Sequence, residues 1–300
     1  HYTHGTIVAK MFENYATDYQ IVSIQLLEDW FVQRKCSTSL LIKALEFCSQ
    51  INIDVVHISL GTTRLSESQK MSEHIYRLTQ SGIPVIAACS NDFYRTIPAA
   101  YPNVFGVVSD KFDLLREGEF AEVYDQYLGT NFVANNQNYF PNIMSFSKSN
   151  SLASTIVTAH VNHILNKGID RSIPEIYCAL QKEGRKVPNT MLPPKTMLAN
   201  RESIPIVYLI DVLSRDPFKQ AALLNEFCAH GYEAIGITCV AGADDIRMIY
   251  YSDAHGLNLR LIQKRLIACT QSDLLIVFLN SKIANFSLSQ DIQNGNVLCI

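Results

Sequence analysis

The sequence contains no apolar run long enough for a transmembrane helix, because none approaches about 18 residues. Its formal net charge is only −3, so it lacks the excess of basic residues typical of proteins that bind nucleic acid or anionic membranes. Its eight cysteines include no CxxC pair, the spacing typical of structural zinc sites. We therefore expect no membrane partner, no nucleic-acid partner, no metal and no other cofactor.

The sequence also lacks an initiator methionine and a signal peptide, and it opens on His1 in the middle of a pattern. We therefore expect it to be a fragment whose N-terminal part is missing. The cysteines are scattered, and most lie in apolar settings such as that of Cys89, where a thiol behaves as a small hydrophobic side chain. This usage favours a reducing, cytoplasmic location.

The length and composition indicate about two globular domains, because the chain has 300 residues, of which 48% are hydrophobic and 18% charged. In the first half, patterns typical of buried strands alternate with patterns typical of helices. The expected strands are 21–27, 54–60, 83–89 and 104–109, and the expected helices are 39–49, 66–80 and 151–165. This alternation predicts an α/β fold with a parallel sheet and helices on both faces. Residues 111–149 predict short strands and loops.

The second half begins with a proline-rich stretch that predicts a linker at 185–203. A new alternation follows it, with expected strands at 206–210, 233–238 and 273–279 and expected helices at 219–230 and 258–268. The sequence therefore predicts a first domain at 1–184 and a second, smaller α/β domain at 204–300, which we expect to be incomplete.

A run of small polar residues ends at Ser151, directly before an apolar helix. Unpaired backbone N–H groups at a helix N-terminus favour developing negative charge, which suits a nucleophile. A serine hydroxyl also needs a nearby histidine to accept its proton and donors that stabilise the oxyanion. The loop segments that supply such groups here contain His4 and Asn91.

The first domain resembles the subtilisin-like serine peptidases (subtilases). Residues 4–10 (HGTIVAK) stand where the family has His-Gly-Thr-His-Val-Ala-Gly, and residues 59–61 match its Ser-Leu-Gly. Residues 88–91 (ACSN) match Ala-Ala-Gly-Asn, and residues 98–102 (PAAYP) match the proline-alanine, tyrosine-proline run that follows it. Residues 149–155 (SNSLAST) match Gly-Thr-Ser-Met-Ala-x-Pro. The motifs occur in family order over roughly residues 1–170.

The resemblance implies a serine endopeptidase that hydrolyses peptide bonds of a peptide or protein substrate. It implies His4 as the general base and acid, Ser151 as the nucleophile and Asn91 as the oxyanion donor. A substrate-binding edge that pairs with an extended peptide would be formed by Ser59, Leu60 and Gly61. The alternative readings are a histidine in a turn, an asparagine in a turn and a serine that only caps its helix.

The sequence departs from the family pattern in several places. The family's aspartate precedes the histidine, so it must lie upstream of His1 or be absent. Ser90 and Ser149 replace glycines, Thr155 replaces the usual proline, and Lys10 replaces a glycine. Such changes fit a specialised enzyme, for example one that matures a peptide precursor, and they equally fit a catalytically inactive subtilase-like protein that binds peptides.

The second domain weakly resembles a degenerate P-loop nucleotide-binding domain. Lys219 follows the expected strand at 206–210 as the lysine of a P-loop does, but the glycines are missing and Gln220 replaces Ser or Thr. Backbone N–H groups wrap a phosphate only where glycines allow it. We therefore expect an α/β domain used for docking and no nucleotide partner, and the alternative is a domain that binds ATP or GTP through Lys219.

Overall fold

The computed structural model describes residues 3–26, 37–136, 148–187, 204–242, 245–251 and 259–280, and the backbone of 297–299. The chain divides into two compact units, the first comprising 1–62 and 69–193 and the second 63–68 and 194–300. The short segment 63–68, which the sequence analysis placed in the first domain, thus groups with the second. Most of the expected linker, residues 188–203, lies outside the described residues.

The first unit contains a five-stranded sheet with the order β1-β2-β3-β5-β4. Its strands are β1 (Val56–Ile58), β2 (Val85–Ala88), β3 (Phe105–Ser109), β4 (Phe120–Asp125) and β5 (Thr130–Ala134). All neighbours pair in parallel except β4, which pairs antiparallel with β5 at one edge. The α/β fold class is therefore confirmed, and the antiparallel strand comes from the stretch where only short strands and loops were expected.

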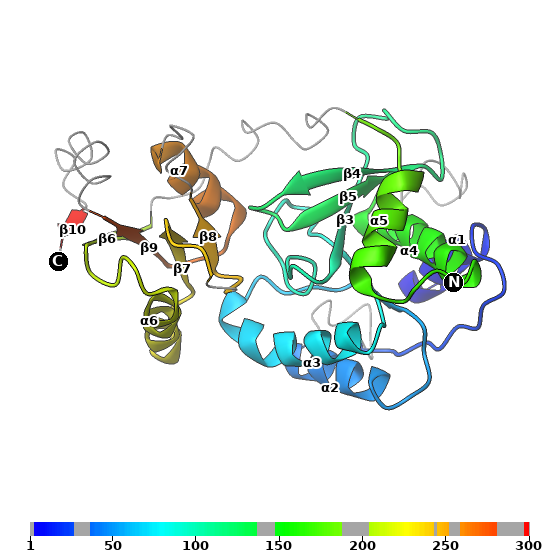
Figure 1. Cartoon of the computed structure of the whole chain (residues 1–300), viewed down its shortest axis with the longest axis horizontal. Coiled ribbons are helices and arrows are strands. Elements are labelled where there is room, and N and C mark those ends of the chain that lie inside the picture. The colour runs from blue at the N-terminus through cyan, green and yellow to red at the C-terminus, as the bar shows by residue number, and fades with distance from the viewer. Residues whose placement is uncertain are drawn as a thin grey trace. The chain divides into compact units, whose positions relative to one another are not determined.

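Helices cover both faces of this sheet (Figure 1). They are α1 (His4–Glu13), α2 (Thr38–Cys48), α3 (Ser68–Gln80), α4 (Asn150–Asn166) and α5 (Ile173–Glu183), and the turn η1 (Leu65–Glu67) precedes α3. Helices α1, α4 and α5 gather on one side, and α2 and α3 lie on the other. The sequence analysis did not predict α5, whose Ile176 and Leu180 are fully buried in the core.

Helix α4 is the core helix of the first unit, because 13 of its 17 residues are buried. It packs on β2, β3 and β5 through apolar side chains that include Ile156, Val157 and Val161. A helix that is apolar around most of its circumference is stable only when enclosed. Each such side chain contributes about 1.5–3 kcal/mol on burial, so the position of the α4 N-terminus is firmly fixed.

The strand expected at 21–27 does not form in its described part, since residues 21–26 carry no strand. Ile21 and Val22 are 46% and 59% exposed. Their apolar run predicted a buried strand, but no strand among the described residues pairs with them. An apolar run becomes a strand only when a neighbouring strand supplies its hydrogen bonds. Residue 27 lies outside the described residues.

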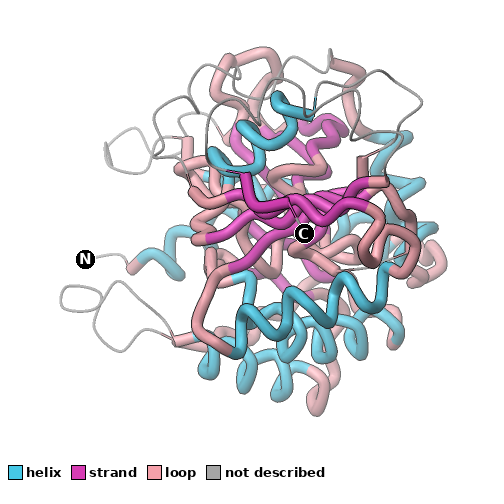
Figure 2. The backbone as a smooth tube through the Cα atoms, turned by 90° about the vertical axis from the view of Figure 1, so that its left-hand side faces the viewer, coloured by secondary structure: helices cyan, strands magenta, loops and turns pink. Residues whose placement is uncertain are grey.

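The second unit contains a parallel sheet with the order β10-β6-β9-β7-β8. Its strands are β6 (Ile206–Ile210), β7 (Ala234–Thr238), β8 (Met248–Tyr250), β9 (Leu274–Leu279) and β10 (Val297–Cys299), and its helices are α6 (Pro217–Ala229) and α7 (Leu259–Cys269). In both sheets the strands run side by side (Figure 2). Within the described residues, no helix has the length and apolar character required to span a bilayer.

Candidate functional site

Asn150 anchors the start of α4 to the carboxyl ends of two strands. Its side-chain Nδ2 donates to the backbone oxygens of Cys89 and Ser90, at 3.0 and 2.9 Å, just after β2. Its Oδ1 accepts from the backbone N–H of Ser109, the last residue of β3, at 2.8 Å. Asn150 is 1% exposed, so these three bonds are shielded from water. The sequence analysis missed this residue, although a buried amide beside strand ends is well suited to link them.

Asn91 lies directly against the α4 N-terminus. Its Oδ1 accepts from the backbone N–H of Asn150 at 3.0 Å. Its Nδ2 makes no hydrogen bond with the described residues, and the side chain is exposed. The oxygen of the amide is therefore occupied by the helix, while neither of its N–H groups has an acceptor among the described residues.

Ser151 is the second residue of α4, and only 8% of it is exposed. The N-terminal cap is Ser149, whose Oγ accepts from the N–H of Leu152 at 3.3 Å, so Ser151 is not the capping residue. Neither the backbone N–H nor the hydroxyl of Ser151 has a hydrogen-bond partner among the described residues. A free N–H beside a free hydroxyl at a helix N-terminus can stabilise a negatively charged oxygen.

His4 begins α1, which packs on α4. Just past the end of α1, the N–H of Thr17 donates to Asn162 at 3.1 Å and its oxygen accepts from Asn166 at 2.7 Å, both near the C-terminal end of α4. The two helices therefore run in the same direction, and their N-termini lie at the same end of the pair. Burial lowers the pKa of His4 below its ordinary value, which favours the neutral imidazole.

The Ser151 hydroxyl and the His4 ring share this end of the fold, but no hydrogen bond joins them, since Ser151 Oγ has no partner among the described residues. In proteins without a bound substrate such bonds are often long or poorly aligned. The structure thus brings His4, Asn91 and Ser151 to neighbouring elements of one unit without forming the base–nucleophile bond.

A second histidine, which the sequence analysis missed, lies close to His4. His57 is in the middle of β1, and its ring contacts Thr158 of α4 and Ser59. Burial, together with the smaller effect of a charge on neighbouring His4, lowers its pKa to about 4. The signal available in the sequence was the polar side chain of His57 within a strand whose neighbouring residues are apolar.

Ser59, Leu60 and Gly61 follow β1, which is an edge strand of the sheet. The next residue, Thr62, exchanges backbone hydrogen bonds with Ile97, at 2.9 and 3.0 Å. These three residues therefore link β1, an edge strand among the described residues, to the bridge between Thr62 and Ile97. Their pairing with an extended peptide stays a prediction.

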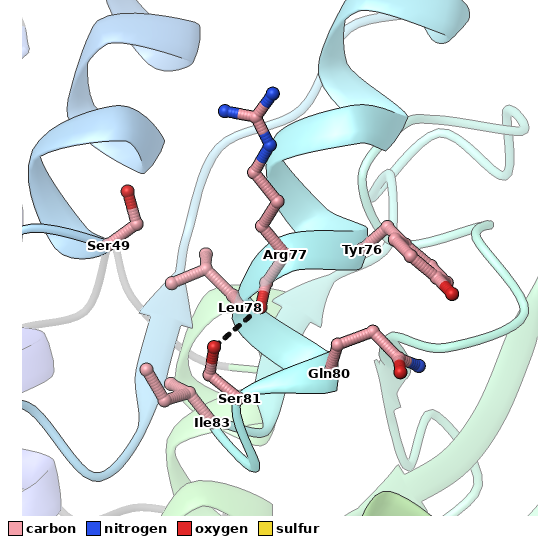
Figure 3. Close-up of a pocket in the computed structure, with 7 residues that line it drawn as sticks. All are labelled: Ser49, Tyr76, Arg77, Leu78, Gln80, Ser81 and Ile83. Atoms are coloured by element: carbon pink, nitrogen blue, oxygen red, sulfur yellow. Dashed lines mark hydrogen bonds between the residues drawn. The ribbon is translucent and has the colours of Figure 1, made fainter.

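Two other features do not add to this site. Within the described residues, no three His, Cys, Asp or Glu side chains lie close enough together to hold a metal ion. A surface hollow lies at the C-terminal end of α3 (Figure 3). Its lining contains none of the candidate residues and consists of Ser49, Tyr76, Arg77, Leu78, Gln80, Ser81 and Ile83.

The helix start that resembled a P-loop is occupied by the chain's own carboxylate. Asp216 caps α6 by accepting from the N–H of Lys219 at 3.0 Å, and the Lys219 ammonium lies 3.5 Å from the same carboxyl group. The N–H of Lys219 would point at a phosphate in a P-loop. The P-loop resemblance of the second unit stays a prediction.

Comparisons with known proteins gave matches among solved structures alone. No family model and no curated protein matches the sequence. The chain is similar to the prenylagaramide maturation protease PagA, with 21% identity and a TM-score of 0.38 over 49% of this chain and 57% of that chain. It is also similar to a psychrophilic protease, with 15% identity and a TM-score of 0.38 over 50% and 57% of the two chains.

A third similar structure is sphericase, with 15% identity and a TM-score of 0.35 over 48% of this chain and 53% of that chain. In each comparison the match spans little more than half the length of the known structure.

Proposed function

We propose that the chain is a serine endopeptidase of subtilisin type, with His4 as the base, Ser151 as the nucleophile and Asn91 as the oxyanion donor. The observation that carries the proposal is the hydrogen bond from the N–H of Asn150 to Asn91. This bond holds the carboxamide of Asn91 at the start of α4, where neither its N–H groups nor the N–H of Ser151 have an acceptor among the described residues. Two donors that converge next to a hydroxyl are what acyl transfer requires.

The proposed mechanism uses the neutral imidazole of His4. The ring accepts the proton of the Ser151 hydroxyl while the oxygen attacks the substrate carbonyl carbon. The negative charge that develops on the carbonyl oxygen is stabilised by Asn91 Nδ2–H and the Ser151 N–H. His4 then donates its proton to the leaving amine, and a water molecule repeats the sequence to release the acid.

The proposed substrate is an extended peptide that pairs with Ser59, Leu60 and Gly61 at the edge of β1. Main-chain hydrogen bonds of this kind give affinity without strict sequence selection.

The test is labelling of the full chain with a fluorophosphonate probe, which reacts with activated serine hydroxyls. We expect stoichiometric labelling at Ser151, loss of labelling in Ser151→Ala and strong slowing in His4→Ala. Ser81→Ala, which alters an exposed serine elsewhere in the same unit, is the matched control and should label normally. A folded protein that is not labelled would contradict the proposal.

A second candidate function is peptide binding without catalysis, favoured by the missing hydrogen bond between His4 and Ser151. In that case labelled peptides bind, the affinity is unchanged in Ser151→Ala, and no cleavage is detected. Cleavage that depends on His4 would exclude this alternative.

A further inference from the structure

His57 joins the proposed substrate-binding segment to the core helix α4. Its Nδ1 lies 2.9 Å from Thr158 Oγ1, and its Nε2 lies 2.8 Å from Ser59 Oγ. Thr158 is 3% exposed, two turns of helix after Ser151. One imidazole therefore connects β1, the first residue of the proposed substrate-binding segment and the helix that carries the proposed nucleophile.

The direction of these hydrogen bonds follows from the hydroxyl of Thr158. That hydroxyl donates its hydrogen to the backbone oxygen of Ser154 at 2.8 Å, so its oxygen must accept from His57 Nδ1–H. His57 Nε2 is then the unprotonated nitrogen, and the Ser59 hydroxyl donates to it. The network fixes one tautomer and turns the Ser59 hydroxyl toward the protein.

We infer that His57 is a positioning residue for peptide binding, which holds Ser59 and the segment that follows β1 in register with α4. This inference rests on the proposed function, because it assigns a role within the same site. Among the described residues, no hydrogen bond of the His57 ring reaches Ser151 or the oxyanion donors, so its effect on peptide binding passes through the bond to Ser59.

Ser59 does not itself have the setting of a nucleophile, although it donates to an imidazole. Transfer of its proton would create an imidazolium on a ring whose other partner is a neutral hydroxyl. A hydroxyl stabilises that charge far less than a carboxylate does. The burial that lowers the pKa of His57 to about 4 opposes the same transfer.

The first test measures cleavage of fluorescein-labelled casein by the full chain. In His57→Gln we expect KM to rise about tenfold while kcat changes less than about threefold. The reason is that a positioning residue contributes equally to binding of the substrate and of the transition state. Ser59→Ala should change KM in the same direction, and it serves as the second variant because it leaves the His57 ring in the core. His74→Gln, on α3 and outside the site, is the matched control.

Two results would overturn the inference. One is a fall in kcat equal to the fall in kcat/KM with KM unchanged in both variants. The other is fluorophosphonate labelling at Ser59 in place of Ser151, which would make His57 a catalytic base.

A second readout does not depend on catalysis. Nitrogen-15 NMR of the imidazole side chains should show His57 protonated on Nδ1 and unprotonated on Nε2 at neutral pH, and Thr158→Val should abolish this preference. Absence of casein cleavage with the expected tautomer would count against the proposed function alone. The opposite tautomer would overturn the His57 network whether or not the chain cleaves casein.

Discussion

The two units each place a helix N-terminus after polar residues, but they satisfy it differently. In the first unit, α4 is capped by the neutral Ser149, and the N–H of Ser151 is left without an acceptor among the described residues. In the second unit, α6 is capped by the carboxylate of Asp216, and its first residue is Pro217, which has no N–H. Among the described residues, one helix start keeps an N–H group without an acceptor, and the other is neutralised by a carboxylate of the chain itself.

This difference shows that a helix N-terminus is a site only where the chain leaves donors unpaired. The positive end of the helix dipole exists in both units. At α6 the carboxylate of Asp216 already interacts with it, and the ammonium of Lys219 lies against the same carboxylate. At α4 the equivalent place is bordered by the amide of Asn91, whose N–H groups have no acceptor among the described residues.

The largest expected effect is that of removing the anchor of the open helix start. Asn150→Ala should lower the free energy of unfolding by about 3–5 kcal/mol, because it leaves backbone groups just after β2 and at the end of β3 without partners. Urea denaturation measures the change. Asn166→Ala, at the exposed end of the same helix with one hydrogen bond to Thr17, should cost about 1 kcal/mol. Equal losses in both variants would contradict the anchoring role.

Removing the oxyanion donor should affect the reaction more than stability. Asn91→Asp keeps an oxygen that accepts from the N–H of Asn150 but has no N–H to donate. We expect kcat to fall about 10²–10³-fold with a nearly unchanged thermal midpoint. Kinetics with labelled casein check this. An active Asn91→Asp variant would remove Asn91 from the mechanism.

The buried imidazole predicts a pH dependence of stability. The pKa of His57 is lowered to about 4, whereas an unfolded histidine has a pKa of about 6.5. The unfolded state therefore binds more protons between these values, so the stability from neutral His57 is complete above pH 6.5 and is lost as the pH falls toward 4. Relative to His57→Gln, wild type should lose on the order of 2 kcal/mol over this range. Urea denaturation measures the free energy of unfolding at each pH. The same change with pH in both proteins would contradict the prediction.

The smallest effect is expected at the closed helix start. The backbone N–H of Lys219 lowers the pKa of Asp216 below its ordinary value, so its stabilisation is present above a pH of about 3.9 and is lost below it. Asp216→Asn should lower the thermal midpoint slightly at pH 7 and not at pH 2.5. Because the helix start is already neutralised, we also expect calorimetry of the full chain to detect no ATP binding. Measurable ATP binding would contradict the conclusion that the start of α6 is already neutralised by Asp216.

Much of the fold could be predicted from the sequence because its elements follow simple periodicities. The apolar strands β2 and β3 and the long helix α4 lie close to where their patterns placed them. The strand expected at 21–27 failed because apolar character does not reveal whether a neighbouring strand is present. Helix α5 was missed, although Pro174 in its first turn and the apolar spacing of Ile176 and Leu180 were available signals.

Only those residues of the candidate site that lie in sequence motifs could be predicted. His4, Asn91 and Ser151 were found because each lies in a recognisable sequence pattern, and their roles stay predictions. Asn150 and His57 were missed because their importance depends on contacts with residues far away in the sequence, such as Ser109 and Thr158. Long-range hydrogen bonds between buried polar groups leave no periodic signal.

The most direct test of the central claim is a crystal structure of the full chain after reaction with a fluorophosphonate. We predict a covalent bond from phosphorus to Ser151 Oγ, with the phosphoryl oxygen within hydrogen-bond distance of both Asn91 Nδ2 and the Ser151 N–H. An adduct on another residue, or a phosphoryl oxygen that contacts neither donor, would contradict the account.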